Sequence, residues 1–405
     1  MATWPQIDFL CMITASFFKL QTFSRRLLSR FSLSKFPERA IMEKAYDSLI
    51  IGAGPAGLNA ALGLGRVHRS AAVFSNNKFR NDGAHAAHTV LSRDHVKPSL
   101  IREEGIKDIA KYNNTTHIHT TITKIEKTTI GDLSGFTAED ENGQTYTGRT
   151  VILATGSQDV FPDLPGYAAN WPLNIYQCPF CDGHERAHLP KGILAIPTFQ
   201  PMLESVGSML QHMSSPAHAP SFPLDPSQPA HSITIFTNGA IPNTSDPSIA
   251  NAVDTARALG MRFEHRKIAQ LVPATREGAP ARSQEDEACE GVSVVLEDGT
   301  SVYLGFLFHK PPTVPNARGL IEKLGVEMAE SPFGVDVKRV EPFGGTNVAG
   351  VYVAGDVGTP LKSVTGAMFH GGMAAAGVAH QCITEENKIA LARWKARVET
   401  TVASS

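Results

Sequence analysis

Cysteine is scarce in this chain. Its 405 residues include only five cysteines, too few and too scattered for the disulfide framework of a secreted protein, so a reducing compartment fits better. Long apolar runs are also missing, and none reaches the roughly 18 residues that a membrane span needs. A formal net charge of −2 argues against a nucleic-acid-binding surface. With 42% hydrophobic and 19% charged residues, the composition indicates a globular enzyme of about two domains.

Acidic residues are absent from Phe9 to Pro37, where basic residues lie among many serines. This composition is typical of a mitochondrial transit peptide. The alternatives are an unstructured extension or a translation start at Met42. We therefore expect residues 1–42 to be a separate extension. We expect a cytoplasmic location, with mitochondrial import through the basic segment as the alternative.

A glycine-rich turn follows the first predicted strand, residues 48–51, and leads into a predicted helix rich in Ala and Leu. In a G-x-G-x-x-G pattern the glycines allow a tight turn, close approach to a pyrophosphate and close packing of the helix, whose N-terminus favours phosphate. The segment predicts a dinucleotide site that includes Gly52, Gly54, Pro55, Ala56 and Gly57. The next strand lacks the usual acid for the adenosine ribose, so neutral Ser75, Asn76 or Asn77 would have to replace it.

Two later segments extend this pattern. Residues 149–157 predict a buried strand that ends in the turn Ala154-Thr155-Gly156. Residues 351–354 predict another strand, followed by Gly355-Asp356 and a helix of small residues. An Asp at the carboxyl end of such a strand faces the crevice where ligands bind. The alternative is that Asp356 only caps a helix.

The segment "YQCPFCDGHE" (176–185) contains a C-x-x-C pair. A structural zinc site needs four ligands, but no second pair exists at suitable spacing and His184 is too close. A disulfide staple would close a very small loop and constrain the unfolded chain little. A redox dithiol, in which a thiolate exchanges with a substrate, is the favoured interpretation.

In this order, the three segments resemble the two-dinucleotide-binding flavoproteins, and the C-x-x-C placed after the Ala-Thr-Gly turn resembles their thioredoxin reductase branch. The resemblance implies an α/β fold with two Rossmann-like domains, FAD as the cofactor, and a homodimer. The FAD domain would be split into residues 43–159 and 309–400, around an inserted domain at 160–308. No metal is expected.

The resemblance also implies roles for particular residues. Cys181 would exchange electrons with the flavin and Cys178 would react with the substrate. Asp182 would shuttle protons, with His184 and Glu185 as alternatives. The implied flavin contacts, besides the first glycine-rich turn, are Asn76, Asn77, Lys78, Phe79, Arg80, Asn81, His88, Ala154, Gly156, Asp356, Ser363 and Val364.

The inserted domain departs from the reductases. Its first predicted strand, "GILAI", runs into Pro197-Thr198-Phe199-Gln200-Pro201, where a glycine-rich NADPH turn is expected. Without glycines the backbone does not approach a pyrophosphate closely, and prolines remove amide donors. Asn238-Gly239-Ala240 stands where a basic cluster would bind the 2′-phosphate. The sequence therefore predicts loss of the nicotinamide site, and surface loops at 214–231 and 276–291.

Four further features resemble the fungal dithiol oxidases of the gliotoxin and holomycin type: "CPFC" with trailing Glu185, Arg80-Asn81, "HAAHTVLSRDH" (85–95) and "GFLFHKPP" (305–312). That resemblance implies oxidation of a small-molecule dithiol, with O2 as the acceptor, in secondary metabolism. The group often carries His directly after the second cysteine, where this chain has Asp182. The alternatives are an NADPH-dependent thioredoxin-disulfide reductase and an inactive flavin-binding regulatory protein.

Overall fold

The structure is a computed structural model that describes residues 45–214, 233–274 and 291–403. These residues belong to one compact unit that begins at Ala45. The predicted extension 1–42, nearly all of the two predicted surface loops, and Cys289 lie outside the described residues. No described helix combines the length and the apolar character needed to cross a membrane.

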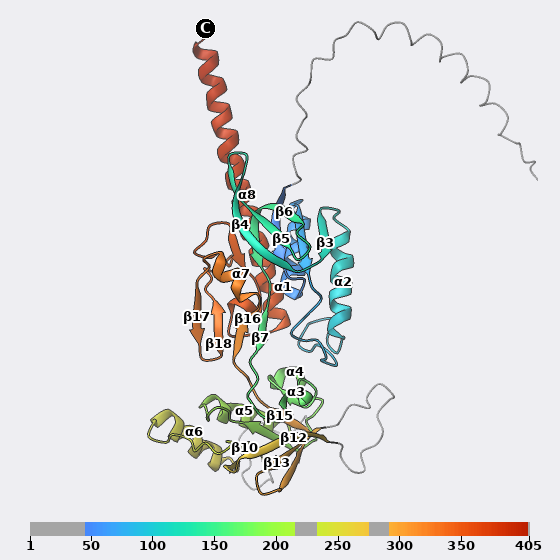
Figure 1. The fold of residues 1–405 in the computed structure, drawn as a ribbon, viewed down its shortest axis with the longest axis vertical. Helices are drawn as coiled ribbons and strands as arrows, with labels where there is room; N and C mark the ends of the chain where they lie inside the picture. The colour runs from blue at the N-terminus through green and yellow to red at the C-terminus, as the bar shows by residue number, and fades with distance from the viewer. Residues whose placement is uncertain (1–44, 215–232, 275–290, 404–405) are drawn as a thin grey trace, which may run out of the picture. The chain divides into compact units, whose positions relative to one another are not determined.

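One seven-stranded sheet contains the strand before the first glycine-rich turn and also the last predicted strand. Its strands β3 to β6 are labelled in Figure 1. Its order is β3-β2-β1-β6-β5-β4, with β19 paired to β6. Its strands are β1 (Tyr46–Ile51), β2 (Ala71–Ser75), β3 (Thr115–His119), β4 (Ile122–Ile130), β5 (Leu133–Asp140), β6 (Thr145–Leu153) and β19 (Val351–Val353). Strands β3, β2, β1, β6 and β19 pair in parallel, whereas β4, β5 and β6 form an antiparallel meander. Segments from both ends of the described chain therefore share one sheet.

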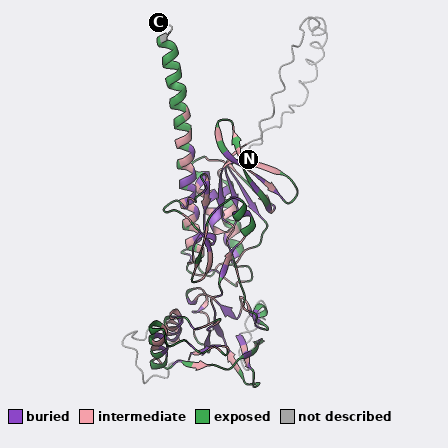
Figure 2. Ribbon diagram, turned by 60° about the vertical axis from the view of Figure 1, so that its left-hand side comes forward, coloured by how far each residue is buried: buried purple, intermediate pink, exposed green. Residues whose placement is uncertain are grey.

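Three helices accompany this sheet: α1 (Pro55–Arg66), α2 (Pro98–Ala110) and α8 (Val364–Ala403). Small residues let α8 pack closely on α1, because a Cβ atom on Gly371 would lie 2.1 Å from the carbonyl oxygen of Ala56. Asn59 Nδ2 also donates a hydrogen bond of 2.6 Å to the Met368 carbonyl. Figure 2 shows that the far end of α8, residues 390–402, is exposed.

A second parallel sheet has the order β11-β10-β9-β15-β8. Its strands are β8 (Ile175–Tyr176), β9 (Lys191–Leu194), β10 (Thr234–Phe236), β11 (Arg262–Glu264) and β15 (Phe306–Phe308). Helices α5 (Met202–Met213) and α6 (Pro247–Ala258) pack on it around a core that includes Ile193, Leu210 and Val253. Two parallel sheets, each with packed helices, confirm the predicted α/β class with two Rossmann-like halves.

Smaller elements complete the fold. Strands β12 (Ile268–Ala274), β13 (Gly291–Leu296) and β14 (Ser301–Leu304) form an antiparallel sheet. The others are β7 (Ser157–Asp159), β16 (Thr313–Pro315), β17 (Met328–Ser331), β18 (Gly334–Val337), α3 (Tyr167–Asn170), α4 (Pro179–Asp182), α7 (Arg318–Lys323) and a 3₁₀ turn (Asp356–Gly358).

The chain passes between the two parallel sheets twice, through β7 and through β16. These two strands pair with each other in antiparallel fashion, with Val314 opposite Gln158. The domain boundaries predicted at 159/160 and 308/309 fall close to this pair. Their exact positions stay predictions.

Candidate active site

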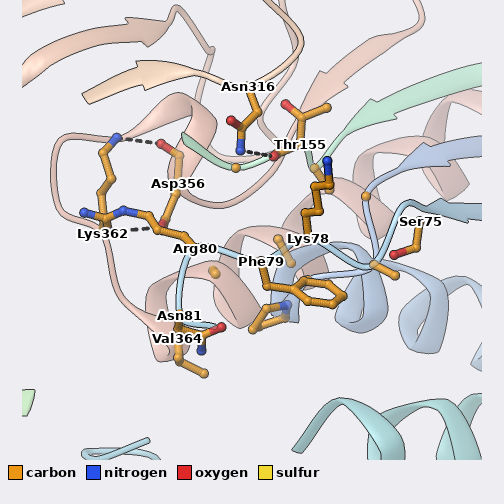
Figure 3. Close-up of a pocket in the computed structure, with 18 of the residues that line it drawn as sticks. Ser75, Lys78, Phe79, Arg80, Asn81, Thr155, Asn316, Asp356, Lys362 and Val364 are labelled. Carbon is orange, nitrogen blue, oxygen red and sulfur yellow. Dashed lines mark hydrogen bonds and ion pairs between the residues drawn. The ribbon is translucent and has the colours of Figure 1, made fainter. Parts of the chain in front are cut away.

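A cavity of about 630 Å³ lies where β1, β2, β6 and β19 end (Figure 3). Its volume is within the range of about 300–1,000 Å³ that is usual for cofactor sites. The predicted cofactor residues that line it are Gly52, Gly54, Pro55, Ala56, Asn76, Lys78, Phe79, Arg80, Asn81, His88, Ala154, Gly156, Asp356, Ser363 and Val364. Gly57 and Asn77 are not among its lining residues.

The three glycines of the first turn have different surroundings. Gly52 has a φ of +111°, and a Cβ there would lie 2.3 Å from the Ala154 carbonyl oxygen. A Cβ on Gly57 would lie 1.9 Å from the Gly52 carbonyl oxygen, so Gly57 serves the packing of α1 rather than the cavity wall. Gly54 is the N-cap of α1, has open space at its Cβ position, and provides no side chain to cap the helix. The free amides of the first helical turn are therefore suited to a phosphate group.

Two buried polar atoms beside the cavity have no partner among the described residues: Thr155 Oγ1 and His88 Nδ1. An unpaired buried polar group costs about 1–3 kcal/mol. A polar ligand in the cavity would remove that cost. Together with the open helix N-terminus, these atoms fit a large ligand that carries phosphates, as a dinucleotide does.

The two neighbouring asparagines after β2 make different contacts. Asn77 turns toward Ser75, whose Oγ lies 3.2 Å from Asn77 Oδ1 and accepts a 3.1 Å hydrogen bond from the Asn77 amide. Asn76 lines the cavity instead. Of the three neutral candidates for the missing acid, Ser75 and Asn76 line the cavity and Asn77 does not.

Arg80 joins segments that are distant in sequence. It makes two hydrogen bonds to Asp159, of 3.0 and 2.7 Å, and a further one to Gln177. Its Nη1 atom also lies 3.5 Å from Asp356 Oδ2 (Figure 3). Burial raises the pKa of Asp356, and the positive charges of Arg80 and Lys362 oppose that shift.

Lys362 fixes the loop that carries Asp356. Its Nζ donates to the carbonyl oxygens of Asp356 (2.7 Å) and Thr359 (2.8 Å), and to Asp336 Oδ1 at 2.8 Å. Ser363 then caps α8, because its Oγ accepts a 3.0 Å hydrogen bond from the Gly366 amide. The predicted helix of small residues begins at Val364, beside the cavity.

Cys178 and Cys181 form a disulfide, with their Cα atoms 5.3 Å apart. Cys178 is the N-cap residue of α4, and Cys181 lies within that short helix. Cys181 and Asp182 line the cavity, whereas Cys178 and His184 are not among its lining residues. The structure thus brings one cysteine and the predicted proton acceptor to the cofactor cavity, while the roles assigned to them stay predictions.

Asp182 is held in a setting suited to proton transfer. Burial raises its pKa to about 6, helped by the nearby charge of Glu185 and opposed by His88 and Arg186. A carboxyl with such a pKa exchanges protons efficiently near neutral pH. His184 and Glu185 were the alternative candidates for the proton shuttle. His184 is exposed, whereas Glu185 Oε1 lies 3.5 Å from Nε2 of the cavity residue His88.

Several cavity residues had no sequence signal. They include Trp171, Pro172, Tyr176, Gln177, Asn316 and Lys362. Asn316, for example, donates a 3.0 Å hydrogen bond to the Thr155 carbonyl and so fixes the predicted Ala-Thr-Gly turn (Figure 3). No local motif marks it, because it comes from the segment after β16.

The turn between β9 and α5 contains a buried aromatic ring. Phe199 is 1% exposed, and its ring centroid lies 5.5 Å from that of Phe263. Pro201 is the N-cap residue of α5, so this position has no amide hydrogen to offer. These features favour the prediction that this turn does not bind a pyrophosphate.

The parallel strands, the dinucleotide-type cavity at their ends and Cys181 of the disulfide in its wall are the features expected of a flavin-dependent disulfide oxidoreductase. The model of the pyridine nucleotide-disulphide oxidoreductase family matches residues 46–196. Thioredoxin reductase sirT of Leptosphaeria maculans is 37% identical over 340 residues, which cover 84% of this chain and 94% of that protein. Thioredoxin reductase aclD of Aspergillus oryzae is 35% identical, with 84% and 98% covered. The chain belongs to this family, in its thioredoxin reductase-like group.

Solved structures support the same fold. An oxidoreductase from Agrobacterium tumefaciens superposes with a TM-score of 0.68 at 28% identity, covering 84% of this chain and 99% of the other. The crystal structure of HlmI gives a TM-score of 0.70 at 25% identity, with 87% and 97% covered. The predicted family, fold and cofactor are therefore confirmed, and FAD is the cofactor that fits the cavity.

Proposed function

We propose that this protein is a dithiol oxidase, which closes a disulfide in a small molecule and passes the electrons to O2. The observation that carries the proposal is the pairing of two features. Cys181 of the Cys178–Cys181 disulfide lines the cofactor cavity, while the turn after β9, where an NADPH turn is expected, contains Pro197 and Pro201 and no glycine. A redox pair without a nicotinamide site needs another electron donor, and a substrate dithiol supplies one.

The cysteine pair would react in two exchanges. A substrate thiolate attacks Cys178, forming a mixed disulfide and releasing Cys181 as a thiolate. The second substrate thiol displaces Cys178, so the product leaves as a disulfide and the enzyme keeps two electrons on its dithiol. Asp182 would accept the proton from each attacking thiol and pass it to a cysteine sulfur that is released, so the carboxylate is free again for the next exchange.

FAD, which the turn containing Gly52 and Gly54 and the loop carrying Asp356 would hold, would supply the two-electron redox chemistry that links the cysteine pair to O2. The net reaction converts one dithiol and one O2 into one disulfide and one hydrogen peroxide. This balance requires no nicotinamide cofactor.

The exposed side chain of Phe180 supports a small organic substrate. It lies between the two cysteines and is 69% exposed, so it offers an apolar contact for the body of a dithiol metabolite. The resemblance to the gliotoxin type favours an epidithiodioxopiperazine precursor or a related secondary metabolite. The relatives are named thioredoxin reductases, which favours the rival activity, NADPH-dependent reduction of thioredoxin.

Oxygen consumption distinguishes these activities. The purified protein is mixed with small dithiols, or with NADPH and thioredoxin, while O2, peroxide and the product disulfide are measured. We expect one O2 to be consumed per disulfide formed when small dithiols are added, and no O2 consumption when NADPH and thioredoxin are added. NADPH-dependent reduction of thioredoxin at a catalytic rate would assign the protein to the reductases.

The pH profile tests Asp182. Because burial raises its folded-state pKa from 3.8 to about 6, the carboxylate that accepts protons forms as the pH rises through 6. Activity should rise over the same interval. Asp182→Asn should lower the rate at pH 7 by roughly 10²–10⁴-fold and remove that rise. His184→Gln is the matched comparison, and a larger loss there than in Asp182→Asn would reverse the assignment.

The same shift predicts a change in stability. Below about pH 3 Asp182 is protonated in both the folded and the unfolded state, so it does not change the free energy of unfolding. As the pH rises from 3.8 to about 6 the unfolded state loses this proton first, which lowers the free energy of unfolding. Asp182→Asn should therefore unfold at a higher temperature than the wild type at pH 7, but not at about pH 3.

We further propose a homodimer and a cytoplasmic location, with mitochondrial import directed by residues 1–42 as the alternative. Light scattering during gel filtration tests the dimer, and a monomeric mass would refute it. Microscopy of tagged chains with and without residues 1–42 tests the location. A mitochondrial signal that depends on those residues would establish the alternative.

A further inference from the structure

Three side chains, among them Glu185 four residues after Cys181, are spaced as metal ligands. Glu185 Oε1 lies 3.5 Å from His88 Nε2 and 3.7 Å from His95 Nδ1. One ligand atom from each of the three residues lies within 4.8 Å of the others. Ligands of a tetrahedral zinc ion, bound at about 2.0–2.2 Å, lie roughly 3.4 Å apart. The cluster therefore needs only small shifts to close around an ion.

The loop between β2 and α2 holds both histidines in place. A backbone bridge between Ala87 and Val96 closes the part of this loop that carries them. Asp94 Oδ1 accepts a 2.9 Å hydrogen bond from the Thr89 amide, and Asp94 Oδ2 lies 3.4 Å from His95 Nε2. A carboxylate on the second ring nitrogen is the usual way in which proteins orient a metal-binding histidine.

The cluster is closed on one side and open on the other. The His88 side chain is 11% exposed, while that of His95 is 62% exposed. With a proton on the buried Nδ1, His88 would turn the lone pair of Nε2 toward the same space as Glu185 Oε1, so both atoms could bind one ion. An ion would thus have a buried inner ligand, an entry path from solvent, and room for a fourth ligand from water.

We propose that His88, His95 and Glu185 form a binding site for a divalent cation of the zinc type. Two histidines, one carboxylate and an open position are the ligand set of many zinc sites. Bound there, the ion engages Glu185, four residues after Cys181, and adds positive charge beside the redox pair. The site is independent of the dithiol oxidase proposal, because it depends only on these three side chains.

Equilibrium dialysis of the flavin-loaded protein against Zn²⁺ tests the site. Thiol reductants are left out, so the Cys178–Cys181 pair stays a disulfide and does not compete for the ion. The wild type should bind one Zn²⁺ per chain at this site. His95→Gln and Glu185→Gln should each lower the affinity by at least about 100-fold, since loss of an outer partner alone costs roughly 10–100-fold.

His85→Gln is the matched control, since His85 is an exposed histidine of the same loop outside the cluster. It should bind Zn²⁺ as the wild type does, and the flavin absorbance of every variant verifies its fold. Wild-type affinity in both His95→Gln and Glu185→Gln would overturn the proposal. So would the absence of stoichiometric Zn²⁺ binding in the wild type.

Discussion

Cys178→Ser and Cys181→Ser should each reduce dithiol-dependent peroxide production by more than roughly 10³-fold while the flavin stays bound. The reason is that each exchange needs a sulfur that serves both as the attacked atom and as a leaving group. Only Cys181 lines the cavity, and neither serine substitution removes a cavity glycine or a phosphate-binding amide. Peroxide release and flavin absorbance are measured on the same samples.

Cys382 supplies the control for these two variants. It is fully buried and unpaired, and burial raises its pKa to about 12, so it offers no thiolate at neutral pH. Cys382→Ala should keep wild-type turnover. Substantial turnover in Cys178→Ser or Cys181→Ser would mean that substrate thiols reach the flavin directly.

Gly52→Ala should destabilise the protein by about 2–6 kcal/mol and abolish flavin retention. Two free-energy costs add. Residues with a side chain rarely adopt a φ of +111°, and the new Cβ would lie only 2.3 Å from the Ala154 carbonyl oxygen. That clash pushes apart the turns after β1 and β6, which form the cavity floor. Thermal unfolding and the flavin-to-protein absorbance ratio are the measurements.

Gly54→Ala separates folding from binding. A Cβ on Gly54 meets nothing within 4 Å, so the fold should keep its stability while the methyl group takes space beside the helix N-terminus. We expect weaker flavin retention without a large loss of stability. Equal destabilisation by Gly52→Ala and Gly54→Ala would contradict the packing account of this turn.

The parts of the site that the sequence predicted are local ones. The turn after β1 is encoded by adjacent residues, since the φ of Gly52 and the tight packing at Gly57 both require glycine. The cysteine pair is equally local. Such features leave a motif because the chemistry and the backbone geometry are specified within a few residues.

The parts that the sequence did not predict arise from long-range contacts. Arg80 bonds to Asp159 and Gln177, which are 79 and 97 positions away. Lys362 fixes Asp356 through carbonyl oxygens, a contact that leaves no pattern in the sequence. Between Asn76 and Asn77, only the turn geometry decides which side chain faces the cavity.

The N-terminal extension illustrates another limit. Its composition predicts targeting, but residues 1–44 lie outside the described part of the chain. The cluster of His88, His95 and Glu185 is a site that the sequence did not predict. His95 and Glu185 are far apart in sequence and meet only in the folded chain. Folded geometry therefore reveals a candidate site that no motif marks.

Anaerobic absorbance spectroscopy of the flavin tests the central claim most directly. The oxidised protein is mixed without O2 with either a small dithiol or NADPH, and air is then admitted. Our account predicts rapid bleaching by the dithiol, negligible bleaching by NADPH, and return of the yellow colour in air with one peroxide per flavin. Rapid, stoichiometric bleaching by NADPH, with none by any dithiol, would contradict it.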